Sequence, residues 1–345
     1  MTVMQRQDSF AVGTPVNGKL GLSVAVGDYD RTRPMVDGRV GIDGVAPVFM
    51  TLSPEEIFFR AFRHAEFHIT ELSLSSHVVR TARGDCDYVG VPAFVSRAFR
   101  HTSIYIRTDR GINSATDLIG KTIGVPEYQV TAAVWARAIL QEQGVSPTQI
   151  RWVRGGQEET GRVEKIKLEL PADISLEDIP ADRTLSGMLA AGEIDAMITP
   201  RAPSCWAEGH PNVGWLYPDP IAAATDYYRR TSIFPIMHIV GIRKDVAASH
   251  PWLPAAVLKA FTQSKTAAMG LLSDTSATKV TMPFVEEQLQ NARRLMGDDF
   301  WSYGLERNRG VLDTFLDQHH REGLSSRRVA VEDLFHPTTC ESFKV

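Results

Sequence analysis

Segments of strand character alternate with segments of helix character along this chain, and this alternation limits the fold more than any other feature. Residues 20–26 form an apolar run that breaks at a glycine, residues 47–51 form a second, and residues 67–72 and 88–94 form two more. A helical segment, residues 53–65, lies between the second and third of these. Strands that alternate with helices build βαβ units. The sequence therefore predicts an α/β fold with a mainly parallel sheet.

The helical segment at Ser53 has a clear start signal. Ser53 is suited to cap the helix, Pro54 to occupy its first position, and Glu56 to complete a capping box. We expect this helix to end near Ala65, immediately before the next strand.

The same alternation begins again further along the chain. TSIYIR at residues 102–107 reads as a strand, KTIGVPE as another, and residues 130–143 as a long helix. SIFPIMHIVGIR at residues 232–243 is a long apolar strand, and the rest of the chain is mostly helical in pattern. A chain of 345 residues also exceeds the size at which one core usually stops growing. Two lobes are expected.

Composition excludes several classes of protein. The net charge is −4 with arginines spread along the chain, which argues against a nucleic-acid partner. Cys86, Cys205 and Cys340 have no C-x-x-C spacing, which argues against a disulfide framework and a thiolate metal site. No segment approaches the ~18 apolar residues of a membrane span, and residues 1–19 contain no apolar core of an export signal. We expect a cytoplasmic protein with no membrane association.

Motifs for other common chemistries are also missing. The sequence contains no G-x-S-x-G elbow, no P-loop and no G-x-G-x-x-G, and Gly155-Gly156 reads only as a turn. His64, Glu66 and His68 look like a metal constellation, but the helix should end between them and turn the histidines apart. We therefore expect no metal site, and hydrolase, nucleotide-dependent and dinucleotide-dependent functions lose their main support.

Several long segments resemble the 4,5-dihydroxyphthalate decarboxylase family, whose fold is that of the type II periplasmic binding proteins. The resemblance covers about residues 20–345, and its clearest segments are GDYDRTRP, AFRHAEFHITELSLSS, VPAFVSRAFRHTSIYIRTDRGI, GVPEYQVTAAVWARAIL, ITPRAPSC, DPIAAATDYYRRTSIFPIMH and ATKVTMPFVEEQ. It implies a two-lobed α/β fold with two hinge-crossing strands and a helical C-terminal region. Lobe 1 would comprise residues 20–104 and 235–345, lobe 2 residues 105–234, and residues 1–19 an N-terminal extension.

The resemblance also implies a reaction, the cofactor-independent conversion of 4,5-dihydroxyphthalate to 3,4-dihydroxybenzoate and CO2 in aromatic catabolism. Direct loss of CO2 from an arene would leave a carbanion outside the ring π system. A hydroxyl para to the carboxylate opens an easier route, in which the ring carbon is protonated before CO2 leaves. Such a site needs a base, an acid and cations that bind carboxylates.

Arginines near the expected cleft are candidates for binding the substrate carboxylates, because a guanidinium fork matches a planar carboxylate. The candidates are Arg31, Arg33, Arg97 and Arg201, with Arg100 also close. The simpler alternative for each is a solvated surface charge.

A second group of candidates lies at the start of the helix after GVPE and in the loop LSLSS. Free backbone N–H groups at a helix start favour an anion. The residues expected to bind substrate there are Tyr128, Gln129, Thr131, Ser73, Ser75 and Ser76. Turn and capping duty would explain the serines equally well.

The candidate acids and bases are His238, His101, Glu127 and Asp28. His238 and His101 lie on or beside the two crossing strands, and an imidazole titrates close to neutrality. Glu127 would serve as a base or cap its helix, and Asp28 or Asp30 would accept a hydroxyl proton or orient Arg31. A core role for the histidines, and a solvated helix end for His319-His320, are the simpler alternatives.

Two rival functions remain open from sequence alone. A non-catalytic binding protein for an aromatic carboxylate would use the same fold, and so would a decarboxylase of a related hydroxybenzoate. A divalent ion held by the catechol hydroxyls of the substrate also stays open. The expected partner is a small aromatic dicarboxylate, and the helical C-terminal third offers a surface for self-association.

Overall fold

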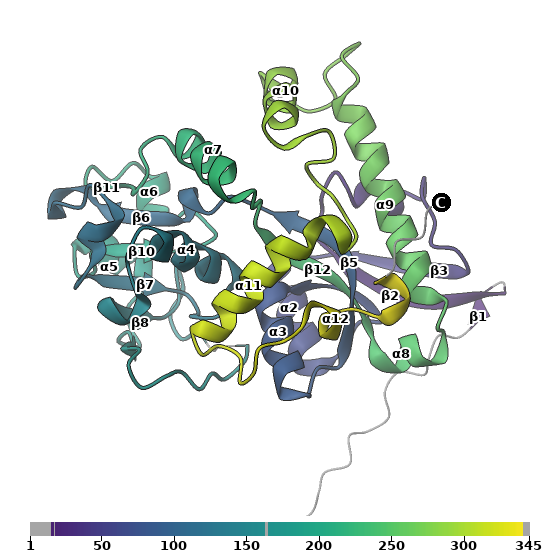
Figure 1. Cartoon of the computed structure of the whole chain (residues 1–345), viewed down its shortest axis with the longest axis horizontal. Coiled ribbons are helices and arrows are strands. Elements are labelled where there is room, and N and C mark those ends of the chain that lie inside the picture. The colour runs from purple at the N-terminus through teal and green to yellow at the C-terminus, as the bar shows by residue number, and fades with distance from the viewer. Residues whose placement is uncertain (1–14, 17, 163–164, 341–345) are drawn as a thin grey trace, which may run out of the picture.

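Two β-sheets divide the molecule into two lobes. The computed structural model describes residues 15–16, 18–162 and 165–340. Lobe 1 is built on a sheet with strand order β1-β2-β4-β12-β5, with β3 paired to β2, and lobe 2 on a sheet with order β11-β6-β10-β7-β8-β9 (Figure 1). The strands of lobe 1 are β1 (Pro15–Val16), β2 (Lys19–Val26), β3 (Val45–Thr51), β4 (Ile69–Ser73), β5 (Tyr88–Arg97) and β12 (Ile236–Arg243). Those of lobe 2 are β6 (Ile104–Arg107), β7 (Thr122–Val125), β8 (Arg151–Arg154), β9 (Leu176–Asp178), β10 (Ala196–Ile198) and β11 (Val213–Trp215).

Helices cover both sheets, and most of those after residue 243 belong to lobe 1. The helices of lobe 1 are α1 (Arg33–Val36), α2 (Pro54–His64), α3 (Leu74–Arg83), α8 (Lys244–Ser249), α9 (Leu253–Leu272), α10 (Val285–Met296), α11 (Arg309–Arg321) and α12 (Val331–Leu334). Those of lobe 2 are α4 (Thr131–Glu142), α5 (Leu185–Ala191), α6 (Ser204–Ala207) and α7 (Pro220–Thr231). None of the described helices is long and apolar enough to cross a lipid bilayer.

The local predictions hold at the start of α2. Ser53 caps the helix by accepting the N–H of Glu56, Pro54 occupies the first position, and Ala65 ends the helix in a left-handed conformation. The expected strands and the long helix α4 also lie where the pattern placed them, within a few residues. Two residues of the triplet His64, Glu66 and His68 have structural partners. Glu66 forms an ion pair with Arg60, and His68 is hydrogen-bonded to Ser23.

The chain passes between the lobes twice, at residues 98–103, between β5 and β6, and at residues 216–235, between β11 and β12. The exact boundaries of the lobes stay a prediction, although the sheets draw their residues from the expected ranges. Residues 1–14 and 17 of the proposed N-terminal extension lie outside the described residues.

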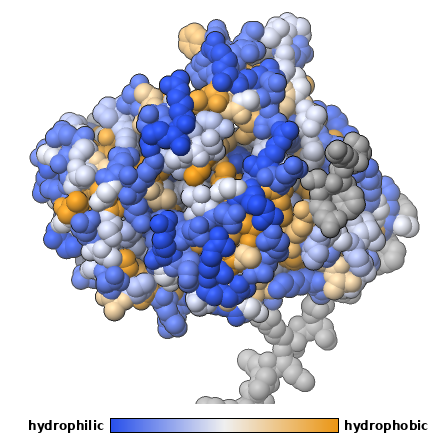
Figure 2. Space-filling model, in the orientation of Figure 1, coloured by the Kyte–Doolittle hydropathy of each residue, from blue (hydrophilic) through white to orange (hydrophobic). Residues whose placement is uncertain are grey.

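The lobes are packed against each other. One apolar cluster includes Ile57 of lobe 1, Ile123 of lobe 2 and Phe315 of α11. The rings of Phe315 and Trp135 of α4 lie 5.2 Å apart, and the indole N–H of Trp135 donates to the carbonyl of Ile236 at the start of β12. Hydrophilic side chains dominate the face seen in Figure 2, with smaller apolar areas between them.

Candidate active site

A fully buried carboxylate, Glu71, lies at the centre of the most unusual polar cluster in lobe 1. It belongs to β4, all of whose residues are buried. Its oxygens accept hydrogen bonds from the backbone N–H of Gly27 (2.8 Å), the hydroxyl of Tyr29 (2.9 Å) and Nδ1 of His238 (2.5 Å). Two separate segments, the loop after β2 and the strand β12, therefore converge on one carboxyl group.

The register of the sheet brings Glu71 and His238 together. β4 and β12 are antiparallel, and His238 stands opposite Ser73. Side chains two residues apart on a strand share a face, so Glu71 lies on the same face as Ser73 and diagonal to His238. β2 runs parallel to β4 on the other side and ends at Val26, which delivers the N–H of Gly27 to the same carboxylate.

Gly27 is required because the chain folds back at this point. A Cβ at this position would lie 2.3 Å from the ring of Tyr29. Only glycine lets the Tyr29 ring pack over the backbone and point its hydroxyl at Glu71.

Hydrogen bonding keeps Glu71 ionised. Burial opposes the charge, but the bonds from His238, Gly27 and Tyr29 outweigh it and hold the pKa of the Glu71 carboxyl below its ordinary value. Burial, together with the charge of Glu71, raises the pKa of the Tyr29 phenol, which stays protonated. Because the ionised Glu71 carboxylate can only accept a hydrogen bond, Nδ1 of His238 carries the proton between them.

His238 therefore presents Nε2 for proton exchange. No described residue forms a hydrogen bond to Nε2, and the side chain is 16% exposed. The ring is held at its edge by Phe58 of α2, with ring centroids 4.8 Å apart. An imidazole fixed in one tautomer with one open nitrogen is suited to general acid–base chemistry.

Arg31 brings a positive charge to the same cluster. Its guanidinium is stacked between the rings of Tyr29 and Trp301, at 4.2 and 4.5 Å. Nε donates to the carbonyl of Val95 (2.5 Å), and Nη1 reaches Asp30 at 3.2 Å. Within the described part of the chain Nη2 has no acceptor. Because the side chain is 17% exposed and held on both faces, it offers an ordered site for an anion.

Tyr303 adds a hydroxyl beside this charge. Its oxygen is buried and has no hydrogen-bond partner among the described residues. Burial raises the pKa of the Tyr303 phenol, against the opposing effect of Arg31 and Arg97. A protonated, buried and unpaired hydroxyl is unusual, and a bound ligand would satisfy it.

Arg100 is a second cation near β12. Its guanidinium contacts the sulfur of Met237 at 3.0 Å and Ser103 Oγ at 3.5 Å, and it has no ion pair with any described carboxylate. Burial lowers the pKa of Arg100 to about 10, so it still carries its charge at neutral pH. Met237 and His238 alternate along β12, which puts Arg100 on the other side of this strand from the imidazole.

Lobe 2 carries a buried carboxylate of a different kind. Glu127, just after β7, accepts from Arg162 at 2.8 Å and from Lys165 at 2.8 Å, while Gln129 donates to its second oxygen at 3.0 Å. Arg162 also reaches Glu55 of lobe 1 at 3.2 Å. The cations on Glu127 therefore join the two lobes, and this geometry does not favour the expected role of Glu127 as a base.

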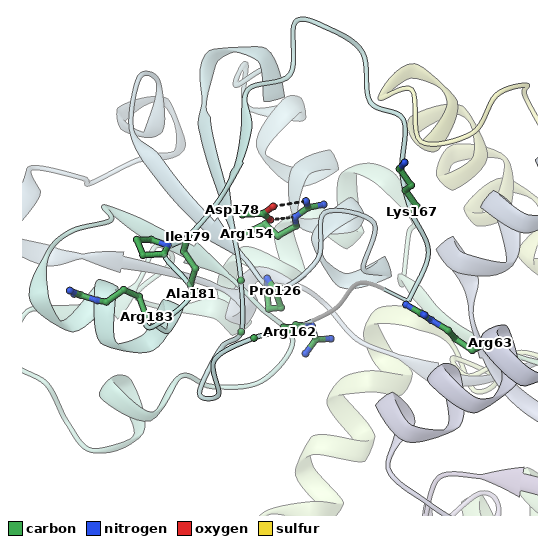
Figure 3. A pocket seen from close by; sticks show the side chains of 13 residues that line it. Arg63, Pro126, Arg154, Arg162, Lys167, Asp178, Ile179, Ala181 and Arg183 are labelled. Carbon is green, nitrogen blue, oxygen red and sulfur yellow. Dashed lines mark hydrogen bonds and ion pairs between the residues drawn. The ribbon is translucent and has the colours of Figure 1, made fainter.

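A cavity of about 500 Å³ opens beside these cations (Figure 3). Arg63 of α2 and Lys167 lie on one side of it and Arg183 on the other, with Arg162 between them. Among the described residues of its wall, the acidic side chain is Asp178, which is paired with Arg154 at 2.6 Å. Arg162 and Arg183 are paired with Glu127 and Glu193 outside the wall, so the wall carries a moderate excess of basic side chains that suits a small anion. Its full lining is Arg63, Pro126, Arg154, Gly155, Gly156, Gly161, Arg162, Lys167, Asp178, Ile179, Pro180, Ala181 and Arg183.

The predicted arginines separate into two groups. Arg31 joins the cluster around Glu71. Arg33 lies on the surface, where it is paired with Asp28, so neither Arg33 nor Asp28 reaches Glu71. Arg97 is buried and spends its donors on the carbonyls of Phe234 and Ser302. Arg201 follows β10 and is exposed, and against the effect of burial its charge helps to lower the pKa of the Glu55 carboxyl of lobe 1. Arg97 thus secures the segment that carries Trp301 and Tyr303, and the prediction that it binds substrate gains no support.

The predicted helix start of lobe 2 is only partly at the site. Tyr128 is fully buried in the core of lobe 2, 3.9 Å from the guanidinium of Arg137 and against Trp152. Its role in substrate binding stays a prediction that this burial does not favour. Thr131 does reach across the lobes, where its hydroxyl meets Ser73 Oγ at 3.0 Å and accepts the N–H of Ser75.

The remaining candidates lie in the interior. Burial lowers the pKa of His101 to about 4, so it is neutral at pH 7 and a poor acid. Ser76 is buried in α3, and the hydroxyl of Ser75 is bonded to Nε2 of His319 at 2.9 Å. The expectation of a solvated His319 is wrong, because α11 packs this residue against α3.

The sequence reasoning missed Glu71, Tyr29 and Tyr303. One signal for Glu71 was present, since it is the one charged residue in the strand ITELS, and a buried charge needs partners. Nothing local marks Tyr303, which reaches the site from a segment more than 200 residues away in sequence.

Comparisons with known proteins agree with this architecture. Residues 72–165 match a family model described as NMT1/THI5 like. The fold is similar to that of a putative periplasmic sulfonate-binding protein SsuA from Methylobacillus flagellatus, with a TM-score of 0.56 and 13% identity over 94% of this chain and 93% of that one. This likeness establishes the two-lobed fold of the type II periplasmic binding proteins.

Sequence relatives are much closer. A 4,5-dihydroxyphthalate decarboxylase from Comamonas testosteroni is 60% identical over 328 residues, which is 95% of this chain and 99% of the relative. The chain belongs to the 4,5-dihydroxyphthalate decarboxylase family. Another member, from Pseudomonas putida, is 63% identical over 63% of this chain and 84% of its own length. Glu71 and His238 thus lie in a member of this decarboxylase family, on a fold shared with binding proteins.

Proposed function

We propose that this protein is a carboxy-lyase that converts 4,5-dihydroxyphthalate to 3,4-dihydroxybenzoate and CO2. The names of its two relatives support the substrate and the reaction. The observation that carries the chemistry is the buried pair of Glu71 and His238, which leaves one imidazole nitrogen open in the cluster that Arg31 joins through the ring of Tyr29. A binding protein has no need for an oriented acid of this kind.

The reaction follows from the positions of the substrate's own groups. One hydroxyl gives up its proton, and the electron pair of its oxygen moves into the ring. The carboxyl-bearing carbon para to that hydroxyl then accepts a proton. The bond to the carboxylate breaks, its electron pair restores the aromatic ring and returns the negative charge to the oxygen, and CO2 leaves. The oxygen is finally reprotonated.

In this scheme the imidazolium of His238 delivers the proton to the ring carbon from Nε2. The Glu71 carboxylate stabilises the imidazolium of His238 through its hydrogen bond to Nδ1 and fixes the orientation of the imidazole ring. After the transfer His238 is neutral and takes a new proton from solvent. The overall reaction consumes one proton, because a dianion becomes a monoanion and neutral CO2.

Binding of the substrate is assigned to the groups that have unused donors. Arg31 would hold the carboxylate that stays on the ring, and the Tyr303 hydroxyl would bond to a substrate oxygen. The positive cavity next to Glu127 would draw the dianion toward the lobes.

The decisive experiment measures CO2 and 3,4-dihydroxybenzoate released from 4,5-dihydroxyphthalate by chelator-treated protein and by the same protein reloaded with a divalent metal. Release by the treated protein supports the scheme above, whereas release only after reloading adds a catechol-bound ion. Phthalate without hydroxyls is the matched control and should not react. Binding without CO2 release in either sample would make this chain a binding protein, and turnover of another hydroxybenzoate alone would change the substrate.

We also propose that the enzyme works in the cytoplasm. Cys86 and Cys205 are buried free thiols, which fits a reducing compartment. Cell fractionation with a periplasmic marker would test this, and recovery of the protein with the marker would refute it.

A further inference from the structure

A helical arm projects from lobe 1 and exposes apolar side chains. The arm comprises residues 273–296, which are the loop after α9 and the helix α10 (Figure 1). Met282 is 59% exposed and Phe284 is 70% exposed in this loop, and Leu289 is the one buried residue of α10. Phe284 also has a positive φ of 63°, which is uncommon for a bulky residue. The arm is therefore poorly covered by its own chain.

A groove of about 770 Å³ separates α10 from α7 of lobe 2. Gln288, Ala292 and Leu295 form one face of α10 along the groove, at helical spacing. Ile221 and Ala224 form the facing stripe of α7, and Ile221 is 70% exposed. Figure 2 shows apolar side chains in this area with hydrophilic ones around them. Two amphipathic helices thus face each other across an unfilled space.

Charge identifies the partner that fits this surface. α10 begins with Glu286 and Glu287 and ends with Arg293 and Arg294. If two copies of α10 lie antiparallel across a two-fold axis, the acidic end of each meets the basic end of the other. Phe284 comes immediately before α10, at its acidic end, and Arg294 and Leu295 at its basic end line the groove. The same arrangement therefore brings Phe284 toward the groove of the second copy. A surface complementary to itself in this way is the mark of an isologous interface.

We propose that the arm and the groove form the interface between two copies of this chain, with α10 antiparallel to its counterpart and Phe284 of each copy in the groove of the other. Each arm then contacts both lobes of its partner, because α7 belongs to lobe 2 and α10 to lobe 1. The interface is independent of the proposed reaction.

The mass of the protein in solution tests this proposal. Sedimentation equilibrium should find a dimer, or a larger assembly built from dimers, for the wild type. Phe284→Asp and Ile221→Asp should each raise the dissociation constant at least ~10-fold, since they put a charge into an apolar contact. Val48→Asp on the edge strand β3 is the matched control, because Val48 is 64% exposed outside this surface. A monomeric wild type, or association that none of the substitutions changes, would overturn the proposal.

Charge reversal tests the antiparallel arrangement itself. Glu287→Arg alone and Arg294→Glu alone should each weaken association, because each brings like charges together across the two-fold axis. The double variant should restore it, since both pairs become opposite again. These side chains are exposed, so folding should be unaffected, and circular dichroism would verify that. Failure of the double variant to recover association would refute the antiparallel pairing.

Discussion

The two lobes contain two buried carboxylates that differ in their partners. Glu71 of lobe 1 accepts hydrogen bonds from an imidazole, a phenol and a backbone N–H. Glu127 of lobe 2 is equally buried, but two permanent cations and an amide surround it. A carboxylate beside an imidazole orients a ring whose other nitrogen can exchange a proton with a substrate. A carboxylate that is fully paired with arginine and lysine holds fixed charges. Here Arg162, which pairs with both Glu127 and Glu55, joins the two lobes.

Under the proposed mechanism, this difference places the chemistry in lobe 1 and the attraction of the substrate in lobe 2. Burial alone does not distinguish the two sites. What distinguishes them is whether a titratable nitrogen is left open after the internal hydrogen bonds are made. The following substitutions test this division.

Replacement of His238 should have the largest effect. His238→Gln removes the proton donor but keeps a polar side chain next to Glu71, so kcat for CO2 release should fall ~10²- to 10⁴-fold. His101→Gln is the control, because this buried histidine is already neutral, and kcat per folded molecule should change little. Steady-state kinetics with melting curves would check both. Equal losses in the two variants would remove the distinction between the histidines.

Replacement of Arg31 should have the next largest effect. Loss of a charge-assisted pair typically costs ~1.5–3 kcal/mol, so Arg31→Ala should lower kcat/KM at least ~10-fold. Arg33→Ala, two residues away in the same loop, should behave as wild type because Arg33 pairs with Asp28 on the surface. If Arg201→Ala were the damaging change and Arg31→Ala harmless, the carboxylate would bind on lobe 2.

A change in the charge of the lobe 2 cavity should have the smallest effect on kcat/KM. Lys167→Glu should lower kcat/KM a few-fold at low salt, leave kcat unchanged, and lose its effect as salt screens the field. Lys259→Glu on α9, which lies outside the cavity, is the control. Initial rates over a series of salt concentrations provide the measurement. If kcat/KM of Lys167→Glu differed from that of the wild type by the same factor at every salt concentration, the cause would be a local structural change instead of electrostatic steering.

Much of the fold follows from local sequence signals. The cap at Ser53, the start of α4 and the alternation of strands and helices were all readable because each depends on neighbours in the chain. The family resemblance supplied the two-lobed arrangement, which local periodicity does not contain.

The site was less predictable because it depends on register and on distant segments. His238 was found as a candidate, but its partner Glu71 lies 167 residues away and is selected by strand pairing. The burial of Tyr128 was not predicted, because a helix start by itself does not say which of its residues face the core. Arg33 and Arg31 look alike in sequence, and only the stacking of Arg31 between Tyr29 and Trp301 separates them.

The most direct test of the division between the lobes is to compare Glu71→Gln with Glu127→Gln in one experiment that records kcat and thermal stability. We expect Glu71→Gln to lower kcat by ~10²-fold or more, because His238 loses the charge that holds its imidazolium. Glu127→Gln should keep kcat per folded molecule but lose about 3 kcal/mol of stability, since Arg162 and Lys165 are left without a buried counter-charge. Normal turnover in Glu71→Gln together with lost turnover in fully folded Glu127→Gln would contradict the account.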